Sequence, residues 1–349
     1  MNDVPRPDVR SGLGWARMAL LVALLGLPPV GACAADLYVG QGLAPVRNFQ
    51  PLQGLSLQMP VDDAIPLKSG ELSLRAHVAE TSTILRETTA TRTALLKFGQ
   101  LRTSVDIRYG TSIEDVEAGV ELASLYRHST GLEGLVTAVE SLVGRPAPIR
   151  RQLKNQGYAY SLGGGPTFNP SNEVFGLTDI VVHGKALLLS EWDYAPAIAL
   201  RVALKVPVGD RTRALGTGLA DFGVGLSLQK TVWNRVGLYV NFNEVLPTGH
   251  YLGLALRGYV TAVTGVEFMA TPKFSITGQF DYYQSPFGNT GFKLLDRGVT
   301  EAALAFGYRF TPTLLWQVYA VENLDFTRDS ASDVTIGTAL TYRIPQSIR

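Results

Sequence analysis

Hydrophobic and polar residues alternate with a period of two over most of the chain from residue 177 onward. A period of two places successive side chains on opposite faces of a strand, whereas an amphipathic helix repeats every 3.6 residues. The clearest alternating runs are 221–229, 235–243, 274–282 and 301–310. In the second run, the apolar positions are Val236, Leu238, Val240 and Phe242. The pattern predicts β-strands that each have one apolar and one polar face.

Turn signals divide the chain into fourteen predicted strands, several of which reach 12 or 13 residues. They are 71–80, 90–98, 101–110, 115–126, 156–163, 177–189, 195–206, 219–231, 234–245, 255–269, 273–284, 298–310, 313–324 and 333–344. Such strands are long, since soluble sheets mostly use five or six residues per strand. The sequence therefore predicts an all-β fold, a transmembrane antiparallel up-and-down β-barrel of about fourteen strands. A soluble β-sandwich or barrel is the alternative.

Turn lengths and aromatic residues favour the membrane barrel. Short turns alternate with longer loops, which are 207–218, 246–254 and 285–297. Outer-membrane barrels have short periplasmic turns, longer outer loops and aromatic girdles. Aromatic residues gather near the short turns: Trp233, Phe268, Phe274, Tyr308, Phe310, Trp316 and Tyr342. An even number of strands would place both termini of the chain in the periplasm.

The first 34 residues have the features of a secretory signal peptide. Three arginines precede an apolar run at 18–30, and Ala32 and Ala34 form a small-residue cleavage site. The run is too short to span a bilayer, which needs about 20 apolar residues. The same region loosely matches a lipobox, in which Cys33 would be lipidated. Both interpretations predict export, here to the outer membrane of a gram-negative bacterium.

Two segments break the alternation. Residues 35–70 contain four prolines and are predicted to form a periplasmic arm or a plug, with a flexible leader as the alternative. Residues 131–144 carry apolar residues at helical spacing and predict an amphipathic helix within an insertion at 131–155. This helix would cap the periplasmic mouth, plug the lumen or lie on the membrane surface.

The last predicted strand carries an assembly motif. Gly337, Leu340 and Tyr342 have the spacing of the terminal signal that the outer-membrane assembly machinery reads. Seven residues follow Tyr342, whereas that signal usually ends on its aromatic residue. The barrel assembly machinery and outer-membrane lipid are therefore the predicted partners.

A short motif adds a resemblance to a known family. Asn48-Phe49-Gln50-Pro51-Leu52, followed by Met59-Pro60, resembles the start of a domain-of-unknown-function family of gram-negative outer-membrane β-barrel proteins. In that family, an Asn-x-x-Pro-Leu segment precedes a barrel whose early strands are interrupted by a helical insertion. The resemblance implies a fold and a location, and it brings no activity.

Composition excludes several classes of function. With 31 Lys and Arg against 30 Asp and Glu, the chain lacks the basic surface of a nucleic-acid-binding protein. A single Cys excludes a disulfide framework and a Cys-based zinc module. The four histidines show no metal-ligand spacing, and the adjacent pair His128-Ser129 has no acidic partner nearby in sequence. We therefore predict no enzyme, no cofactor and no metal site.

The polar face does carry charge. Eleven residues of the inward phase are candidate lumen-lining residues: His183, Lys185, Arg201, Lys205, Asp221, Arg235, Arg257, Glu267, Asp281, Glu301 and Arg309. They would form either a neutralised network that stiffens a closed barrel or the walls of a selective channel.

Because side chains alone fill a barrel of about eight strands, a wider barrel favours a pore. We predict passive or facilitated passage of a small solute, gated by 131–155 or by 36–70. The alternatives are a non-conducting structural or assembly barrel and, less favoured, a lipid-modifying enzyme.

Overall fold

The computed structural model describes residues 40–89, 93–128, 159–162, 174–251, 253–324 and 334–345. These residues belong to one compact unit. The predicted secretory signal at 1–34, with Ala32, Cys33 and Ala34, lies outside the described residues, as does the predicted helical insertion at 131–155.

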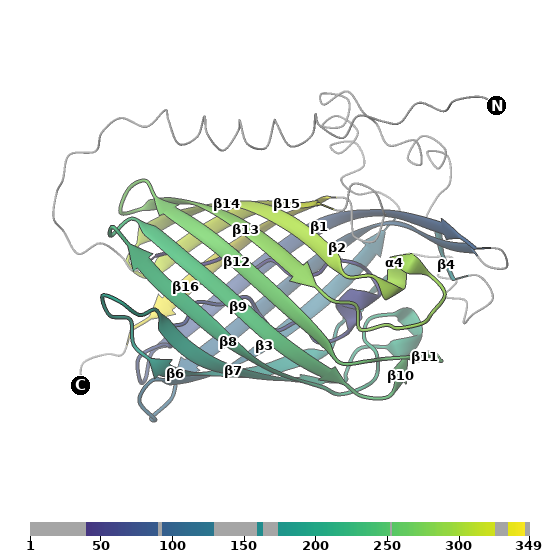
Figure 1. The fold of residues 1–349 in the computed structure, drawn as a ribbon, viewed down its shortest axis with the longest axis horizontal. Helices are drawn as coiled ribbons and strands as arrows, with labels where there is room; N and C mark the ends of the chain where they lie inside the picture. Colours follow the sequence, from purple (N-terminus) through teal and green to yellow (C-terminus); the bar gives the residue numbers. More distant parts are fainter. Residues whose placement is uncertain are drawn as a thin grey trace, which may run out of the picture. The chain divides into compact units, whose positions relative to one another are not determined.

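Twelve antiparallel strands close into a barrel in the part of the chain that the structure describes (Figure 1). In ring order they are β1 (Leu72–Thr88), β2 (Thr93–Gly110), β3 (Val116–His128), β6 (Ile180–Leu189), β7 (Ala197–Val206), β8 (Asp221–Val232), β9 (Val236–Pro247), β12 (Tyr259–Met269), β13 (Phe274–Tyr283), β14 (Val299–Thr311), β15 (Leu314–Asn323) and β16 (Val334–Ile344). The ring closes because β1 pairs with β16, from Leu72 opposite Ile344 to Ser82 opposite Val334. Closure gives every strand two backbone partners, which a barrel in lipid requires.

The ring has two strands fewer than the fourteen predicted. The predicted strands 90–98 and 101–110 are one continuous strand, β2, in which Gly99 pairs with Ser82 rather than forming a turn. The predicted strand 156–163 corresponds to β4 (Ala159–Leu162), which pairs with one end of β2 and stays outside the ring. A similar short strand, β5 (Val174–Leu177), extends the sheet beside β3. The predicted fold class is confirmed, and the number of strands in the ring is twelve.

The two ends of the barrel differ in the length of their connections. At one end, called here the short-turn end, β2–β3, β6–β7, β8–β9, β12–β13 and β14–β15 are joined by tight turns. Trp233 and Asn234 form one such turn, and both have positive φ, as a two-residue hairpin turn of type I′ requires. At the opposite, long-loop end, 207–220, 248–258 and 284–298 join the strands. They contain the turns η2 (Arg211–Arg213) and α4 (Lys293–Asp296), and the pair β10 (His250–Tyr251) and β11 (Leu254–Ala255).

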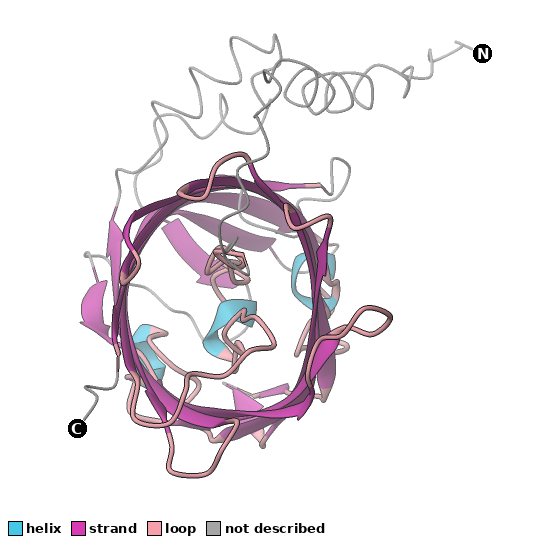
Figure 2. Cartoon of the chain, turned by 90° about the vertical axis from the view of Figure 1, so that its left-hand side faces the viewer, coloured by secondary structure: helices cyan, strands magenta, loops and turns pink. Residues whose placement is uncertain are grey.

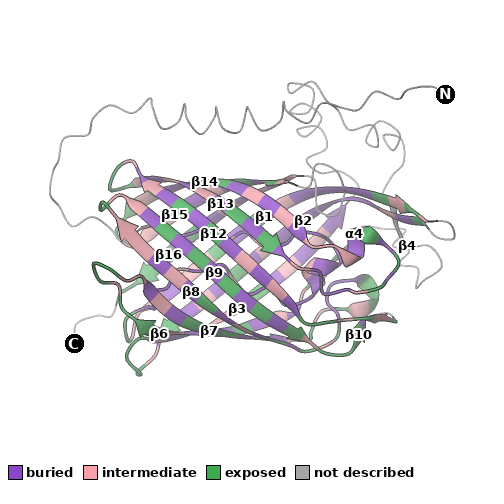
Figure 3. Cartoon of the chain, viewed as in Figure 1, coloured by how far each residue is buried: buried purple, intermediate pink, exposed green. Residues whose placement is uncertain are grey.

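The alternation along each strand separates the two faces of the wall, as the stripes of buried and exposed residues in Figure 3 show. On β9, Leu238, Val240 and Phe242 are exposed on the outside, whereas Tyr239 and Asn241 are buried inside. An apolar outer face on strands of ten or more residues suits the hydrocarbon core of a bilayer. The fold is therefore a transmembrane β-barrel. Among the described residues, no helix has both the length and the apolar character needed to cross a membrane.

Residues 40–70, called here the lumen segment, run inside the barrel. Figure 2 looks along the barrel and shows loop segments within the ring of strands. At the short-turn end, the Gln41 side chain donates to the Lys273 carbonyl, 2.9 Å away. At the long-loop end, the side-chain amide of Gln53 donates to the backbone carbonyls of Leu295 and Arg297, at 3.1 and 2.7 Å. The segment then returns, since the Gly70 amide donates to the Gly110 carbonyl at the short-turn end.

The Asn48–Leu52 motif forms the tip between these two passes. The Asn48 side chain accepts from the Gln50 amide, and the Gln50 side chain accepts from the amides of Leu52 and Gln53. These bonds fold the chain into the single turn η1 (Gln53–Leu55). Leu52 and Leu55 then pack with Leu295 of α4 in the largest apolar cluster described. The motif therefore reverses the chain inside the lumen.

Candidate functional site

The lumen wall supplies hydrogen-bond acceptors to the backbone of the lumen segment. A segment without regular structure must find partners for its buried amides. The amides of Leu57, Ala64 and Leu67 donate to side chains of Asp221, Gln229 and Glu117, at 2.8, 3.2 and 2.8 Å. The amides of Ala44 and Asp62 donate to Gln279 and Asn241, at 2.6 and 2.9 Å. The polar inward residues therefore provide the hydrogen-bond acceptors that the backbone of the segment needs.

Glu267 holds the start of the segment. Its carboxylate accepts from the Gln41 amide at 2.9 and 3.0 Å and from the Tyr239 hydroxyl at 2.7 Å. Gly40 has a φ of +44°, and a Cβ there would collide with the Tyr239 hydroxyl and with Glu267. The close approach therefore requires glycine at this position.

Charged side chains bind the returning pass. Asp62 pairs with Arg108 at 2.7 Å and with Lys185 at 3.1 Å. Lys185 also pairs with Asp63 at 3.0 Å and with Glu117 at 3.4 Å. These groups are almost entirely buried, apart from Asp63 with 23% of its side chain exposed. Because buried charges are tolerated only when paired, the network fixes the segment against β2, β3 and β6.

Two further cations hold backbone carbonyls of the segment. Lys205 donates to the Leu55 carbonyl at 2.9 Å and pairs with Asp221 at 2.8 Å. Arg201 donates to the Pro60 carbonyl and, at 3.1 Å, to Asn241. Both cationic side chains therefore bind the backbone of the lumen segment directly.

The structure buries most of the eleven candidate lumen-lining residues and leaves three of them partly or fully exposed. Eight are buried on the inward face: His183, Lys185, Arg201, Lys205, Asp221, Glu267, Asp281 and Glu301. Arg235 is half-buried in the β8–β9 turn, and Arg309 is half-buried near Gly40. Arg257 is exposed and donates to the carbonyls of Ser285 and Asp296 in the long loops. It differs from the prediction because β12 begins at Tyr259 rather than at 255.

Glycines of the wall make room for the segment. A Cβ on Gly223 would lie 2.7 Å from the Met59 sulfur, and one on Gly265 would collide with Leu43. The inward face is therefore rich in glycine where segment side chains press against it.

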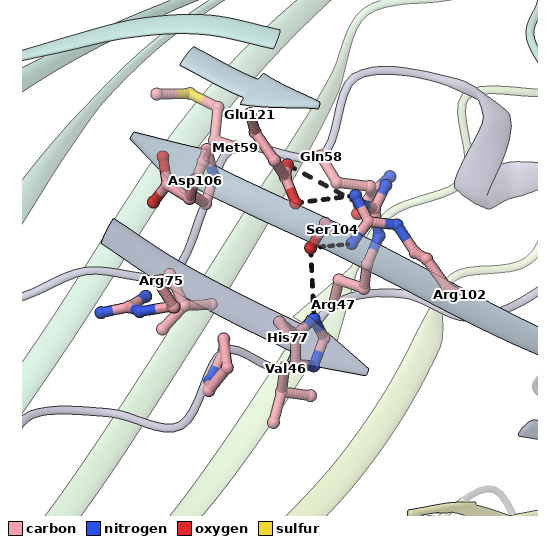
Figure 4. Close-up of a pocket in the computed structure, with 13 residues that line it drawn as sticks. Val46, Arg47, Gln58, Met59, Arg75, His77, Arg102, Ser104, Asp106 and Glu121 are labelled. Carbon is pink, nitrogen blue, oxygen red and sulfur yellow. Dashed lines mark hydrogen bonds and ion pairs between the residues drawn. The ribbon is translucent and has the colours of Figure 1, made fainter. Parts of the chain in front are cut away.

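A cavity remains between the two passes and the wall formed by β1, β2 and β3 (Figure 4). Arg102 of β2 donates to Glu121 of β3 at 2.7 Å and to Ser104 at 3.0 Å. Arg47 of the outgoing pass lies 4.0 Å from the other oxygen of Glu121. Two guanidinium groups thus flank one carboxylate on one side of the cavity.

His77 of β1 completes this side. Its Nε2 lies 2.7 Å from the Tyr319 hydroxyl, and its Nδ1 lies 3.5 Å from the Ser104 hydroxyl. Gln58 of the returning pass lines the cavity from within the lumen. Its side chain is buried, and its Oε1 has no hydrogen-bond partner among the described residues. The cavity therefore offers positive charge and an amide oxygen without a partner among the described residues.

Sequence reasoning missed this group. Arg102, Ser104 and Glu121 lie on β2 and β3, where the alternation is less regular, and the inward phase was read only from residue 183 onward. Extending the same phase to 101–110 and 115–126 would have found them. Arg47 and Gln58 carry no such signal, because hydrophobic and polar residues do not alternate regularly in the lumen segment.

The remaining predicted residues lie at separate places. Gly337 of β16 is buried against Tyr319, whereas Leu340 and Tyr342 are exposed on the outer face. His128 pairs with Glu80 at 3.1 Å, and Ser129 lies outside the described residues. Within the described part of the chain, no three His, Cys, Asp or Glu side chains are grouped so that they could hold a metal ion.

A closed antiparallel barrel with an apolar exterior and a polar, charged lumen defines an outer-membrane β-barrel with a porin-like fold. Residues 30–344 match the family described as "Protein of unknown function (DUF3187)", and the chain belongs to this family. The resemblance seen in the Asn48–Leu52 motif is thereby confirmed. No curated protein matches the sequence.

The chain is also similar, to different degrees, to solved structures of membrane proteins. The COG4313 outer membrane channel from Pseudomonas putida F1 is 10% identical, with a TM-score of 0.55, and the match covers 81% of this chain and 100% of that chain. The NanC porin is 10% identical with a TM-score of 0.45, covering 78% and 100%. The P. putida toluene transporter TodX is 8% identical with a TM-score of 0.39, covering 80% and 91%. At these identities, the likeness to the first of them concerns the fold alone.

Proposed function

We propose that this protein is an outer-membrane channel for a small solute, and that the lumen segment narrows or closes its lumen. One observation carries the proposal: the lumen of the twelve-strand ring is lined by charged and amide side chains and holds a separate segment. Side chains of the wall alone fill a barrel of about eight strands. The wider ring leaves a lumen that side chains of the wall alone do not fill.

The path of the segment supports a gate. Residues 40 and 70 both lie at the short-turn end, so that the segment can withdraw toward that end without crossing the wall. Its polar contacts are hydrogen bonds and ion pairs, which water can replace one at a time, and its apolar contacts with the wall are divided among small clusters. We assign the short-turn end to the periplasm, with export by the signal at 1–34 and insertion by the assembly machinery.

The number of bonds between segment and wall favours a second candidate. A segment held by Glu267, Asp62, Lys205 and Arg201 also suits a barrel that never opens and serves a structural role. The two candidates differ in what happens when the segment is removed.

Single-channel recording of residues 35–349 in a planar bilayer tests the proposal. We expect small or infrequent currents from this chain and larger, continuous currents after deletion of 44–66. The same recordings after deletion of 131–155 test whether the predicted insertion contributes to the gate. A deletion variant of 44–66 that migrates as a folded barrel on electrophoresis but carries no current would refute the channel.

A further inference from the structure

The cavity between the two passes has an excess of positive charge. Asp106, which also lines it, is already paired with Arg108 at 2.6 Å and with His183 at 2.9 Å. Glu121 is paired with Arg102. Two further cations line the cavity, Arg75, whose Nε donates to the Thr341 hydroxyl at 3.2 Å, and Arg47, whose nearest carboxylate oxygen lies at 4.0 Å, which is longer than a hydrogen bond. Only 18% of the Arg47 side chain is exposed, so the guanidinium is largely withdrawn from bulk water.

The side-chain oxygen of Gln58 is a second group of interest in the same cavity. Gln58 is 5% exposed, and its Oε1 has no hydrogen-bond partner among the described residues. A buried amide that finds no partner is costly, and native proteins rarely leave one without a bound water or ligand. Because this oxygen accepts a hydrogen bond, a hydroxyl group that donates is its natural complement.

Arg47 and Gln58 come from opposite passes of the lumen segment and face one cavity (Figure 4). The rest of the inner lining is apolar and consists of Pro45, Val46, Met59, Pro60 and Val61. A ligand that fits must therefore be small, carry one anionic group for the guanidinium and present a hydroxyl to the amide. Guanidinium groups bind carboxylates through two parallel hydrogen bonds.

We infer that this cavity binds a small hydroxylated carboxylate, with Arg47 as the ligand of the carboxylate and Gln58 as the ligand of the hydroxyl. The inference rests on the proposed function, since it names the class of solute that the channel takes. Arg75 and Arg102 add to the positive potential, which disfavours cations. Binding between the two passes would couple solute occupancy to the position of the segment.

Titration calorimetry on the mature chain 35–349, folded in detergent micelles, tests the inference. Three probes form a matched series: lactate, propionate, which lacks the hydroxyl, and propane-1,2-diol, which lacks the carboxylate. We expect lactate to bind most tightly and the diol to show no binding. Inorganic phosphate serves as a fourth probe, and tighter binding of phosphate than of lactate would overturn the assignment to a carboxylate.

Three variants locate the site. We expect Arg47→Gln to weaken lactate about tenfold or more, as loss of a charge-assisted pair does. Gln58→Leu should weaken lactate several-fold and leave propionate unchanged. Arg86→Gln is the control, because Arg86 is exposed on β1 and does not line the cavity. Equal lactate affinity in all three variants would overturn the inference.

The binding site and the channel are tested by separate outcomes. A chain that conducts but does not bind lactate would contradict the solute class and leave the channel standing. A chain that binds lactate at Arg47 but never conducts, even after deletion of 44–66, would contradict the channel and leave the binding site standing.

Discussion

Asp281 of β13 lies directly opposite Glu301 of β14 on the inward face of the wall. Their exposed fractions are 0% and 2%. Both oxygens of Asp281 and one oxygen of Glu301 lack a hydrogen-bond partner among the described residues. Side chains at opposite positions of antiparallel strands lie about 5 Å apart, where two like charges repel. Burial beside each other and without a cationic partner in the described part of the chain therefore disfavours the charged form of both groups.

Neutralising one member of the pair should stabilise the barrel. Asp281→Asn or Glu301→Gln removes one of the two buried acidic groups and lets an amide donate to the remaining carboxyl group. We expect a gain in the free energy of unfolding of about 1 kcal/mol or more. Urea titration, followed by the electrophoretic shift of the folded barrel, measures it. Glu114→Gln is the control, since Glu114 is exposed in the β2–β3 turn; an equal gain there would refute the explanation.

The pairing of Asp62 with Arg108 and Lys185 predicts the opposite sign. Asp62→Asn leaves two buried cations with less negative charge, and breaking such a pair costs about 3 kcal/mol. We expect a lower unfolding midpoint and faster proteolysis of residues 40–70 in the folded barrel. Asp63→Asn should have a smaller effect, because the Asp63 side chain is 23% exposed. If the two variants are cut at the same rate, Asp62 does not anchor the segment.

The alternation of residues predicted the barrel because the wall has a repeating physical cause, lipid outside and polar lumen inside. The phase of the alternation placed Lys185, Arg201 and Lys205 on the inward face, where the structure buries them. It split β2 at Gly99 because a Gly-Gln pair resembles a turn in sequence, whereas here Gly99 pairs within the strand. The register of a neighbouring strand decides such cases, and a single sequence does not contain it.

The lumen segment could not be placed from its sequence. Its prolines exclude regular structure, and its contacts depend on side chains more than 100 residues away, such as Asp221 for Leu57 and Gln279 for Ala44. Composition alone is equally compatible with an arm outside the barrel. The glycines of the inward face were the indirect signal, since they make space that wall side chains do not fill.

The terminal strand predicts an assembly phenotype. Tyr342 is 46% exposed on the outer face of β16, near the short-turn end, as the terminal assembly signal requires. We expect Tyr342→Ala to reduce the amount of folded barrel in the outer membrane several-fold. The measurement is the fraction of the protein that migrates as the folded form when unheated membrane samples are separated by electrophoresis. Tyr308→Ala is the matched control, because Tyr308 is 38% exposed on β14. A similar loss in both variants would attribute the effect to lipid contact and not to the signal.

Gly265 offers a test of the gate that leaves the charges of the lumen unchanged. A Cβ at this position would collide with Leu43, which is enclosed by Val61, Tyr239 and Val263 and cannot swing aside. Gly265→Leu should therefore push the outgoing pass away from β12. The expected cost of overpacking is about 1–3 kcal/mol, and the displaced segment should give larger or more frequent single-channel currents.

Gly278 provides the control for this substitution. It lies on β13 beside Gly265, opposite Val266, and a Cβ there meets no atom within 4 Å. Gly278→Leu should therefore leave both the currents and the position of the segment unchanged. Currents that rise equally in both variants would mean that the substitution acts on the wall. Currents that rise only in Gly265→Leu would show that the contact between Leu43 and β12 keeps the lumen closed, because the two variants add the same side chain to neighbouring strands, at Gly265 toward the segment and at Gly278 on the outer face of the wall.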